Sequence, residues 1–155
     1  MSEDILEKQL FEVIQNKELS EEIKLAKVDM LVKLGVDVNV VNKNNTPLMS
    51  ACIFGSEKIV KLLIDNGADV HQKDDIGRDA LMIASWLGDN NEKVLELLID
   101  NGAEVNQKNN YGRTALMLAS MRGYKEFVEL LIQSGADVGV KNNDGETAID
   151  LAKDD

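Results

Sequence analysis

A short pattern that returns at a nearly fixed spacing is the strongest constraint on how this chain folds. Each copy starts with Thr or Asp and continues with small and apolar residues. The four copies begin at Thr46, Asp79, Thr114 and Thr147, which are spaced 33, 35 and 33 residues apart. A period of about 20 to 50 residues indicates a stack of similar units, each of which buries its apolar face against its neighbours.

A second pattern keeps step with the first. It has the form G-A-D-V-N or a close variant, starts at Gly35, Gly67, Gly102 and Gly135, and follows an apolar stretch with helical spacing each time. Thr and Asp are good N-terminal caps, and Gly commonly ends a helix. Each unit is therefore predicted to hold a short helix, a longer helix and a polar turn.

Together the two patterns resemble the ankyrin repeat, closely so over about residues 35 to 152. The resemblance implies an all-α solenoid of stacked helix-turn-helix units with projecting β-turn loops. We predict one ankyrin-repeat domain over residues 1–155. Within it, residues 2–34 would form an N-terminal helical cap with helices at 4–16 and 20–34, and residues 35–152 three repeats plus a C-terminal half repeat built on a fourth short helix.

The chain departs from the family pattern at three places. The His that follows Thr-Pro-Leu in the family is replaced by Met49, Met82, Met117 and Asp150, so packing must supply the tie between repeats. Residues 40–45 lack the turn Gly and are one residue short, which predicts a differently shaped first turn. Residues 89–92 exceed their counterpart by two residues, which predicts a bulge between two helices.

Charge and composition exclude several classes of function. The net charge is −11, which argues against nucleic acid and anionic membranes as partners. A single Cys allows no internal disulfide, and neither a signal peptide nor a membrane span is evident. We expect a cytoplasmic, monomeric protein.

Catalytic chemistry is poorly supported by the sequence. The one His, His71, and the one Cys, Cys52, occupy different parts of the repeat. No phosphate-binding Gly loop or metal-ligand spacing occurs, and the Asp- and Asn-rich turns lack the spacing of a calcium-binding loop. We predict no enzyme activity, no cofactor and no metal. The family offers one modification, hydroxylation of an Asn in the position of Asn39 and Asn106, but bonding across the turn is the favoured role.

Binding is better supported. In ankyrin-like repeats, partners contact the projecting turns and the ends of the short helices, and here these positions are rich in apolar, aromatic and arginine side chains. The predicted partner-binding residues are Ile53, Phe54, Ile76, Arg78, Trp86, Leu87, Tyr111, Arg113, Met121 and Arg122. Trp, Tyr and Arg are the types most enriched in binding hot spots. For Ile53, Leu87 and Met121, an inward orientation into the stack remains open.

The predicted function is a non-catalytic protein–protein interaction module that binds through a concave groove and its loop tips. Two alternatives stay open. The first is a small-molecule or nucleotide binder, with Trp86 and Tyr111 for stacking and Arg78 and Arg113 for phosphate. The second is a fragment of a larger multidomain protein.

Overall fold

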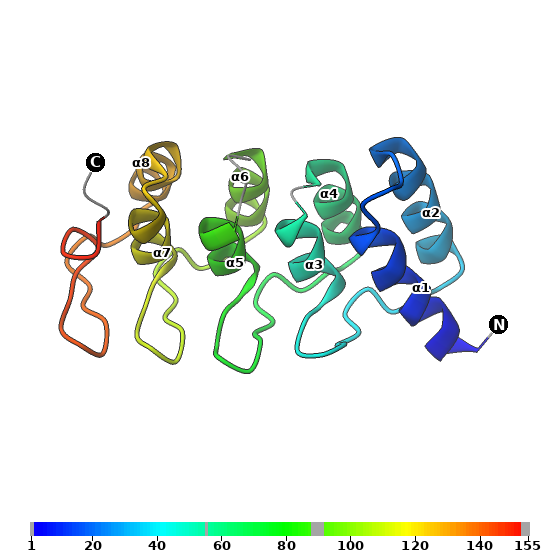
Figure 1. Cartoon of the computed structure of the whole chain (residues 1–155), viewed down its shortest axis with the longest axis horizontal. Coiled ribbons are helices and arrows are strands. Elements are labelled where there is room, and N and C mark those ends of the chain that lie inside the picture. Colours follow the sequence, from blue (N-terminus) through cyan, green and yellow to red (C-terminus); the bar gives the residue numbers. More distant parts are fainter. Residues whose placement is uncertain (1, 55, 88–91, 153–155) are drawn as a thin grey trace.

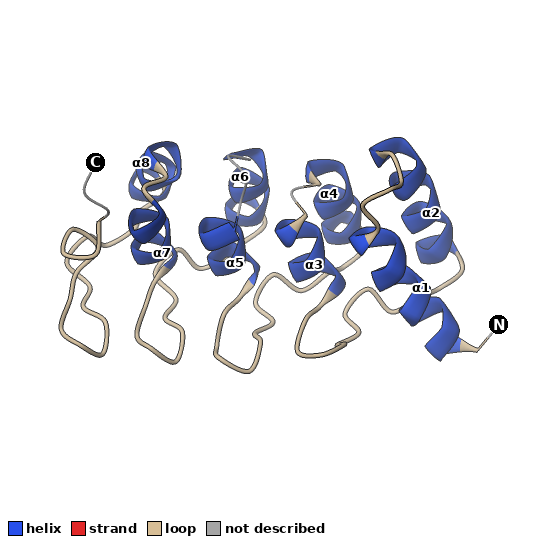
Figure 2. Ribbon diagram, in the orientation of Figure 1, coloured by secondary structure: helices blue, strands red, loops and turns tan. Residues whose placement is uncertain are grey.

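Helix pairs stack side by side in the computed structural model, which describes residues 2–54, 56–87 and 92–152. The pairs are α1 (Glu3–Gln15) with α2 (Glu21–Lys33), α3 (Pro47–Ile53) with α4 (Glu57–Asp65), α5 (Ala80–Leu87) with α6 (Glu92–Asp100), and α7 (Ala115–Arg122) with α8 (Lys125–Gln133). Figure 1 shows the stack, and Figure 2 shows the connecting turns projecting on one side of it. No helix in the described ranges has the length and apolar character needed to cross a membrane.

The short helices α3, α5 and α7 begin where the sequence predicts. The side-chain oxygens of Thr46, Asp79 and Thr114 accept hydrogen bonds from the backbone N–H three residues ahead, at 3.1, 2.9 and 3.3 Å. Each of these bonds satisfies a donor that has no partner inside the helix. The repeated Thr or Asp is therefore confirmed as a helix cap.

The short helices form the centre of the core. α3 packs on α5 and α5 packs on α7, while the longer helices α4, α6 and α8 form a second row. Met49, Met82 and Met117 are each about 1% exposed, so they fill the interior where the family pattern has His. This burial agrees with the prediction that packing takes the place of the His hydrogen bonds.

Asn side chains add a second tie between repeats. Asn39 donates to the carbonyl of Gly67 (2.9 Å) and accepts from the Asp69 N–H (2.7 Å). Asn106 makes the same two bonds to Gly135 (3.0 Å) and Asp137 (2.7 Å). These asparagines therefore have a structural role, but their side chains bond to the next repeat and not across their own turn.

The two helices of the N-terminal pair differ in how much they bury. α1 buries Leu6, Leu10, Phe11 and Ile14 against α2 and α3, but α2 buries Val28 and Leu31 alone among its described residues. Ile23 and Ala26 in α2, and Leu34 directly after it, are exposed. α2 contacts α1 and α4, which together cover a narrow stripe of its surface.

The first projecting turn differs in shape from the later ones, as its sequence indicates. Asn42 and Asn45 exchange both backbone hydrogen bonds, at 2.9 and 3.0 Å, around two residues in the left-handed region, Lys43 (φ 48°) and Asn44 (φ 66°). This is a two-residue hairpin loop. The bulge predicted at residues 89–92 falls almost wholly outside the described residues.

The predicted fourth short helix is wrong. Residues 147–152 form a single turn, closed by the bond from the Leu151 N–H to the Thr147 carbonyl at 3.2 Å. The Asp150 carboxylate accepts from the Thr147 N–H and hydroxyl, both at 2.8 Å, and these bonds lower its pKa. Ile149 is 82% exposed, so buried Ala148 and half-buried Leu151 supply the apolar contact of this segment with the stack.

Candidate functional site: a hollow between two projecting turns

Two successive turns, residues 74–78 and 109–113, are built alike and lie against each other. In each turn the first side chain, Asp74 or Asn109, accepts hydrogen bonds from the backbone N–H groups two and four residues ahead, at 2.8 to 3.1 Å. Across the turns, the Asn110 N–H donates to the Ile76 carbonyl at 3.0 Å. These bonds hold the tips of the two turns in a fixed register.

A hollow of about 210 Å³ lies between these turns and the short helices behind them. Its walls come from the turn at residues 74–78, the turn at residues 109–113, α5 and α7. The lining residues are Ile76, Arg78, Trp86, Asn109, Tyr111, Arg113 and Leu118. Five of the ten residues predicted from sequence therefore share one cavity: Ile76, Arg78, Trp86, Tyr111 and Arg113.

Arginines and aromatic rings orient one another at this site. The Arg113 guanidinium carbon lies 5.7 Å from the centre of the Tyr111 ring. The Arg122 guanidinium lies 5.2 Å from the Trp86 ring centre and 5.6 Å from that of Tyr124, and it donates to the Tyr124 hydroxyl at 3.2 Å. Cation–π contacts of this geometry contribute roughly 0.5–1 kcal/mol at exposed sites, enough to bias the side-chain conformations.

The other predicted site residues lie outside the lining of the hollow. Ile53 and Met121 are half-buried and pack against the core, so the inward orientation holds for them in part. Phe54 and Leu87 are 38% and 37% exposed. Arg122 adjoins the hollow through its stack on Trp86.

Sequence reasoning missed three residues at the site: Asn109, Leu118 and Tyr124. The signal for Asn109 was available, because it stands at the position of Asp74 in the preceding turn. Asn109 is buried, and its side-chain oxygen accepts two hydrogen bonds within the turn. Asn142 repeats this role in the last turn, at 2.9 Å to each of its two donors.

The two residues considered for nucleophilic chemistry lack the setting for it. Cys52 is buried, and that burial, with the Asp79 carboxylate adding to it, raises the pKa of its thiol to about 12. A thiol of this kind stays protonated and unreactive near neutral pH. His71 is exposed on a turn. In the described part of the chain, no group of three or more His, Cys, Asp or Glu side chains could hold a metal ion.

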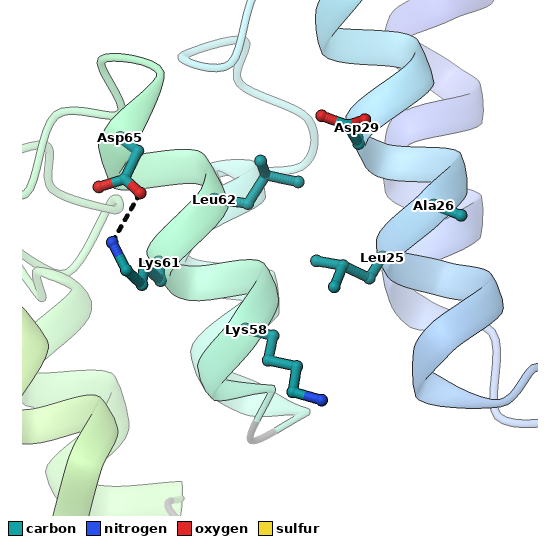
Figure 3. A pocket seen from close by; sticks show the side chains of 7 residues that line it. All are labelled: Leu25, Ala26, Asp29, Lys58, Lys61, Leu62 and Asp65. Carbon is teal, nitrogen blue, oxygen red and sulfur yellow. Dashed lines mark hydrogen bonds and ion pairs between the residues drawn. The ribbon is translucent and has the colours of Figure 1, made fainter.

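A wider groove of about 500 Å³ lies on the outer row, between α2 and α4. Figure 3 shows Leu25 and Leu62 pointing toward each other across it, with polar side chains at the rim. Lys61 pairs with Asp65 at 2.7 Å along one helix, so that part of the rim is already neutralised. The hollow between the turns is smaller, but it alone of the two brings aromatic rings and arginines together.

The stacked helix pairs and their projecting turns define a helical-repeat protein of the solenoid class. The chain belongs to the ankyrin repeat family, because the family model described as "Ankyrin repeats (3 copies)" matches residues 19–109 and 81–154. Ankyrin repeats generally serve as protein–protein interaction modules, and the family is typically non-catalytic.

Two viral ankyrin repeat proteins are similar to this chain. Over 49 residues, 30% of this chain, it is 47% identical to the protein FPV031 of fowlpox virus (strain NVSL), and the match spans 14% of that protein. Over 84 residues, 50% of this chain, it is 36% identical to the protein R664 of Acanthamoeba polyphaga mimivirus, with 51% of that protein covered. The chain thus spans about half or less of these curated relatives.

Proposed function

We propose that this chain is a non-catalytic module that binds a protein partner on the face formed by α3, α5, α7 and the projecting turns. The observation that carries the proposal is the hollow in which Trp86, Tyr111, Arg78 and Arg113 come together. Tyr111 is 53% exposed and the other three are half-buried, so each is held in place and still reaches solvent. Such a preordered surface reduces the entropy lost when a partner binds.

The dimensions of the hollow favour a protein partner over a free small molecule. Ligand pockets commonly enclose roughly 300–1,000 Å³ and bury most of their ligand. The hollow measures about 210 Å³, which suits one or two side chains of a partner. The net charge of −11 further supports a partner other than nucleic acid, and we propose a monomeric, cytoplasmic protein.

The test is a comparison of capture and affinity between variants. Wild type is immobilised and exposed to a lysate of the organism that encodes the chain, and the retained protein is identified and purified. Its affinity is then measured by calorimetry for wild type and for Trp86→Ala/Tyr111→Ala. Truncating hot-spot aromatic residues typically costs about 2 kcal/mol or more, so we expect at least a roughly tenfold loss.

A matched control removes apolar area elsewhere. Ile23→Ala/Met30→Ala truncates two exposed side chains of α2, 48% and 62% exposed, and should leave the affinity unchanged. Circular dichroism establishes that both double variants fold. If the α2 variant loses binding while Trp86→Ala/Tyr111→Ala retains it, the proposed site is wrong.

A further inference from the structure

In three of the projecting turns, the side chains of the first and fifth residues face each other and can be compared. The first and fifth residues of the three turns are Asp74 and Arg78, Asn109 and Arg113, and Asn142 and Glu146. In every turn the first side chain uses one oxygen to accept from the backbone. The other terminal atom of this side chain, an oxygen in Asp or a nitrogen in Asn, faces the fifth side chain. Whether that atom accepts or donates decides whether the fifth side chain can form a hydrogen bond with it.

In the first and third of these turns the fifth side chain is satisfied. The second oxygen of Asp74 accepts from Arg78 Nε at 2.7 Å, and the Asp74 side chain is only 2% exposed. In the last turn, Asn142 Nδ2 donates to the Glu146 carboxylate at 2.9 Å. A carboxylate thus faces a guanidinium in one turn, and an amide N–H faces a carboxylate in the other.

In the middle turn, residues 109–113, the first and fifth side chains cannot bond to each other. The Asn109 oxygen is committed to the Tyr111 and Arg113 N–H groups, which leaves an amide NH₂ as its second group. An amide NH₂ and a guanidinium are both donors, so they cannot bond to each other. In agreement, Arg113 Nε is buried without a hydrogen-bond partner, and no ion pair joins Arg113 to a carboxylate in the described ranges.

The surroundings of Arg113 suit an incoming anionic group. Arg113 lines the hollow together with Ile76, Trp86, Tyr111 and Leu118, which supply apolar surface. A guanidinium stays charged at any physiological pH and presents parallel donors to a carboxylate. A low-dielectric wall strengthens the bond once water has been displaced.

We infer that the hollow takes an Asp or Glu side chain of the protein partner, bound to the terminal nitrogens of the Arg113 guanidinium, with an apolar partner residue beside it on Trp86 and Tyr111. This inference deepens the proposed function and rests on it. The net charge of −11 disfavours a polyacidic segment, because repulsion would grow with each added carboxylate. The occupant is therefore a mostly apolar segment that carries one carboxylate at the contact.

Two substitutions change which arginine, Arg78 or Arg113, has a carboxylate partner within its own turn. Asn109→Asp gives the middle turn the carboxylate that Asp74 supplies in the turn before it, so Arg113 becomes paired internally. The side-chain oxygen that accepts from the backbone is retained, and Asp74 demonstrates that a carboxylate fits this place. Asp74→Asn is the converse, since it removes the internal partner of Arg78 and leaves Arg113 untouched.

The experiment selects peptides from a displayed random 12-residue library on the immobilised full chain. We expect the enriched peptides to share one Asp or Glu next to an apolar or aromatic residue. A synthetic enriched peptide should bind Asn109→Asp about tenfold or more weaker than wild type, and Asp74→Asn at least as tightly as wild type. Its Glu→Gln or Asp→Asn version should bind wild type and Asn109→Asp equally well.

The outcomes separate this inference from the proposed function. If enriched peptides lack an acidic residue, or bind Asn109→Asp as well as wild type, yet are lost on Trp86→Ala/Tyr111→Ala, the hollow binds and the carboxylate inference is overturned. If the peptides also bind Trp86→Ala/Tyr111→Ala unchanged, the proposed site fails as well. A selection that enriches no peptide contradicts both.

Discussion

At the scale of single residues, the helix cap Asp79 carries a charge in a place where its counterparts carry none. Asp79 is 3% exposed and accepts from the Met82 N–H, while Thr46 and Thr114 make the same bond with a hydroxyl. Burial raises the pKa of the Asp79 carboxyl, although its backbone bonds and the charges of Lys73 and His71 partly oppose the rise. The folded chain therefore binds a proton at Asp79 more readily than the unfolded chain does.

This difference predicts a stability that depends on pH. A raised pKa in the folded state contributes stability that is complete below the unfolded value and is lost as pH rises through the folded value. At pH 7 the charged, buried carboxylate is thus a cost that Asp79→Thr removes while keeping the cap. We expect Asp79→Thr to melt about 2–4 °C higher at pH 7, corresponding to about 1 kcal/mol in a chain of this length.

Thermal melts of wild type and Asp79→Thr between pH 4 and pH 8 test this, and the gap should shrink toward pH 4. Thr114→Asp is the matched reverse change and should lower the melting temperature at pH 7. Equal melting temperatures at pH 7, or a gap that stays constant with pH, would contradict the argument.

At the scale of elements, the turns depend on Gly for two separate reasons. Gly112 has φ of 71°, and a Cβ at this position would lie 2.5 Å from Asn143 Oδ1 and 2.8 Å from Asn143 N. Gly145 has φ of 81° in the last turn, and a Cβ there would meet nothing within 4 Å. The two positions share the backbone conformation, but only Gly112 also lies under a following turn.

Alanine substitution separates these two reasons. Gly145→Ala should cost about 1 kcal/mol for the left-handed backbone alone. Gly112→Ala must also push the neighbouring turn away, so we expect a further loss of about 1–3 kcal/mol. Urea unfolding of both variants measures the difference, and similar losses would mean that the contact between turns contributes little.

These glycines also show how much of the turn structure can be predicted from the sequence. Gly and the following Thr or Asp place the turns and the helix starts, because both act within a few residues of themselves. The contact of Gly112 with Asn143 joins adjacent repeats, and its closeness depends on how those repeats stack. The absence of the predicted fourth helix has the same origin: Thr147 is a good cap, but capping alone does not stabilise a helix in which Ala148 is buried and Ile149 is exposed.

The candidate site was predictable only in part, because local signals mark its residues but the stacking of repeats decides which of them meet. Trp86, Tyr111 and Arg113 stand out by residue type and by position in the repeat, and the structure brings them to one hollow. Ile53, Trp86 and Met121 are all half-buried and pack against the core, but of these three only Trp86 also lines the hollow. Which of them reaches the hollow depends on how the neighbouring repeats stack. The missing partner of Arg113 was readable from Asp74 and Asn109, once the turns were compared residue by residue.

At the scale of the whole molecule, the stability of a repeat stack is approximately a sum of the stabilities of its repeats and of the interfaces between them. Two interfaces have an Asn tie, from Asn39 and from Asn106. His71 stands at the equivalent position between them, and its side chain makes no hydrogen bond within the described residues. The central interface therefore lacks a tie that its neighbours have.

His71→Asn should supply this tie. By equivalence with Asn39, the new amide would donate to the Gly102 carbonyl and accept from the Glu104 N–H. Two hydrogen bonds at an exposed site should add about 1 kcal/mol, and the matched reverse change Asn106→His should remove a similar amount.

Because the gain belongs to an interface, it should also slow hydrogen exchange at the Glu104 amide, whereas a gain confined to the turn of residue 71 would leave that amide unchanged. Urea unfolding combined with amide exchange therefore decides the matter, and a His71→Asn chain without added protection at Glu104 would show that the central interface does not need the tie.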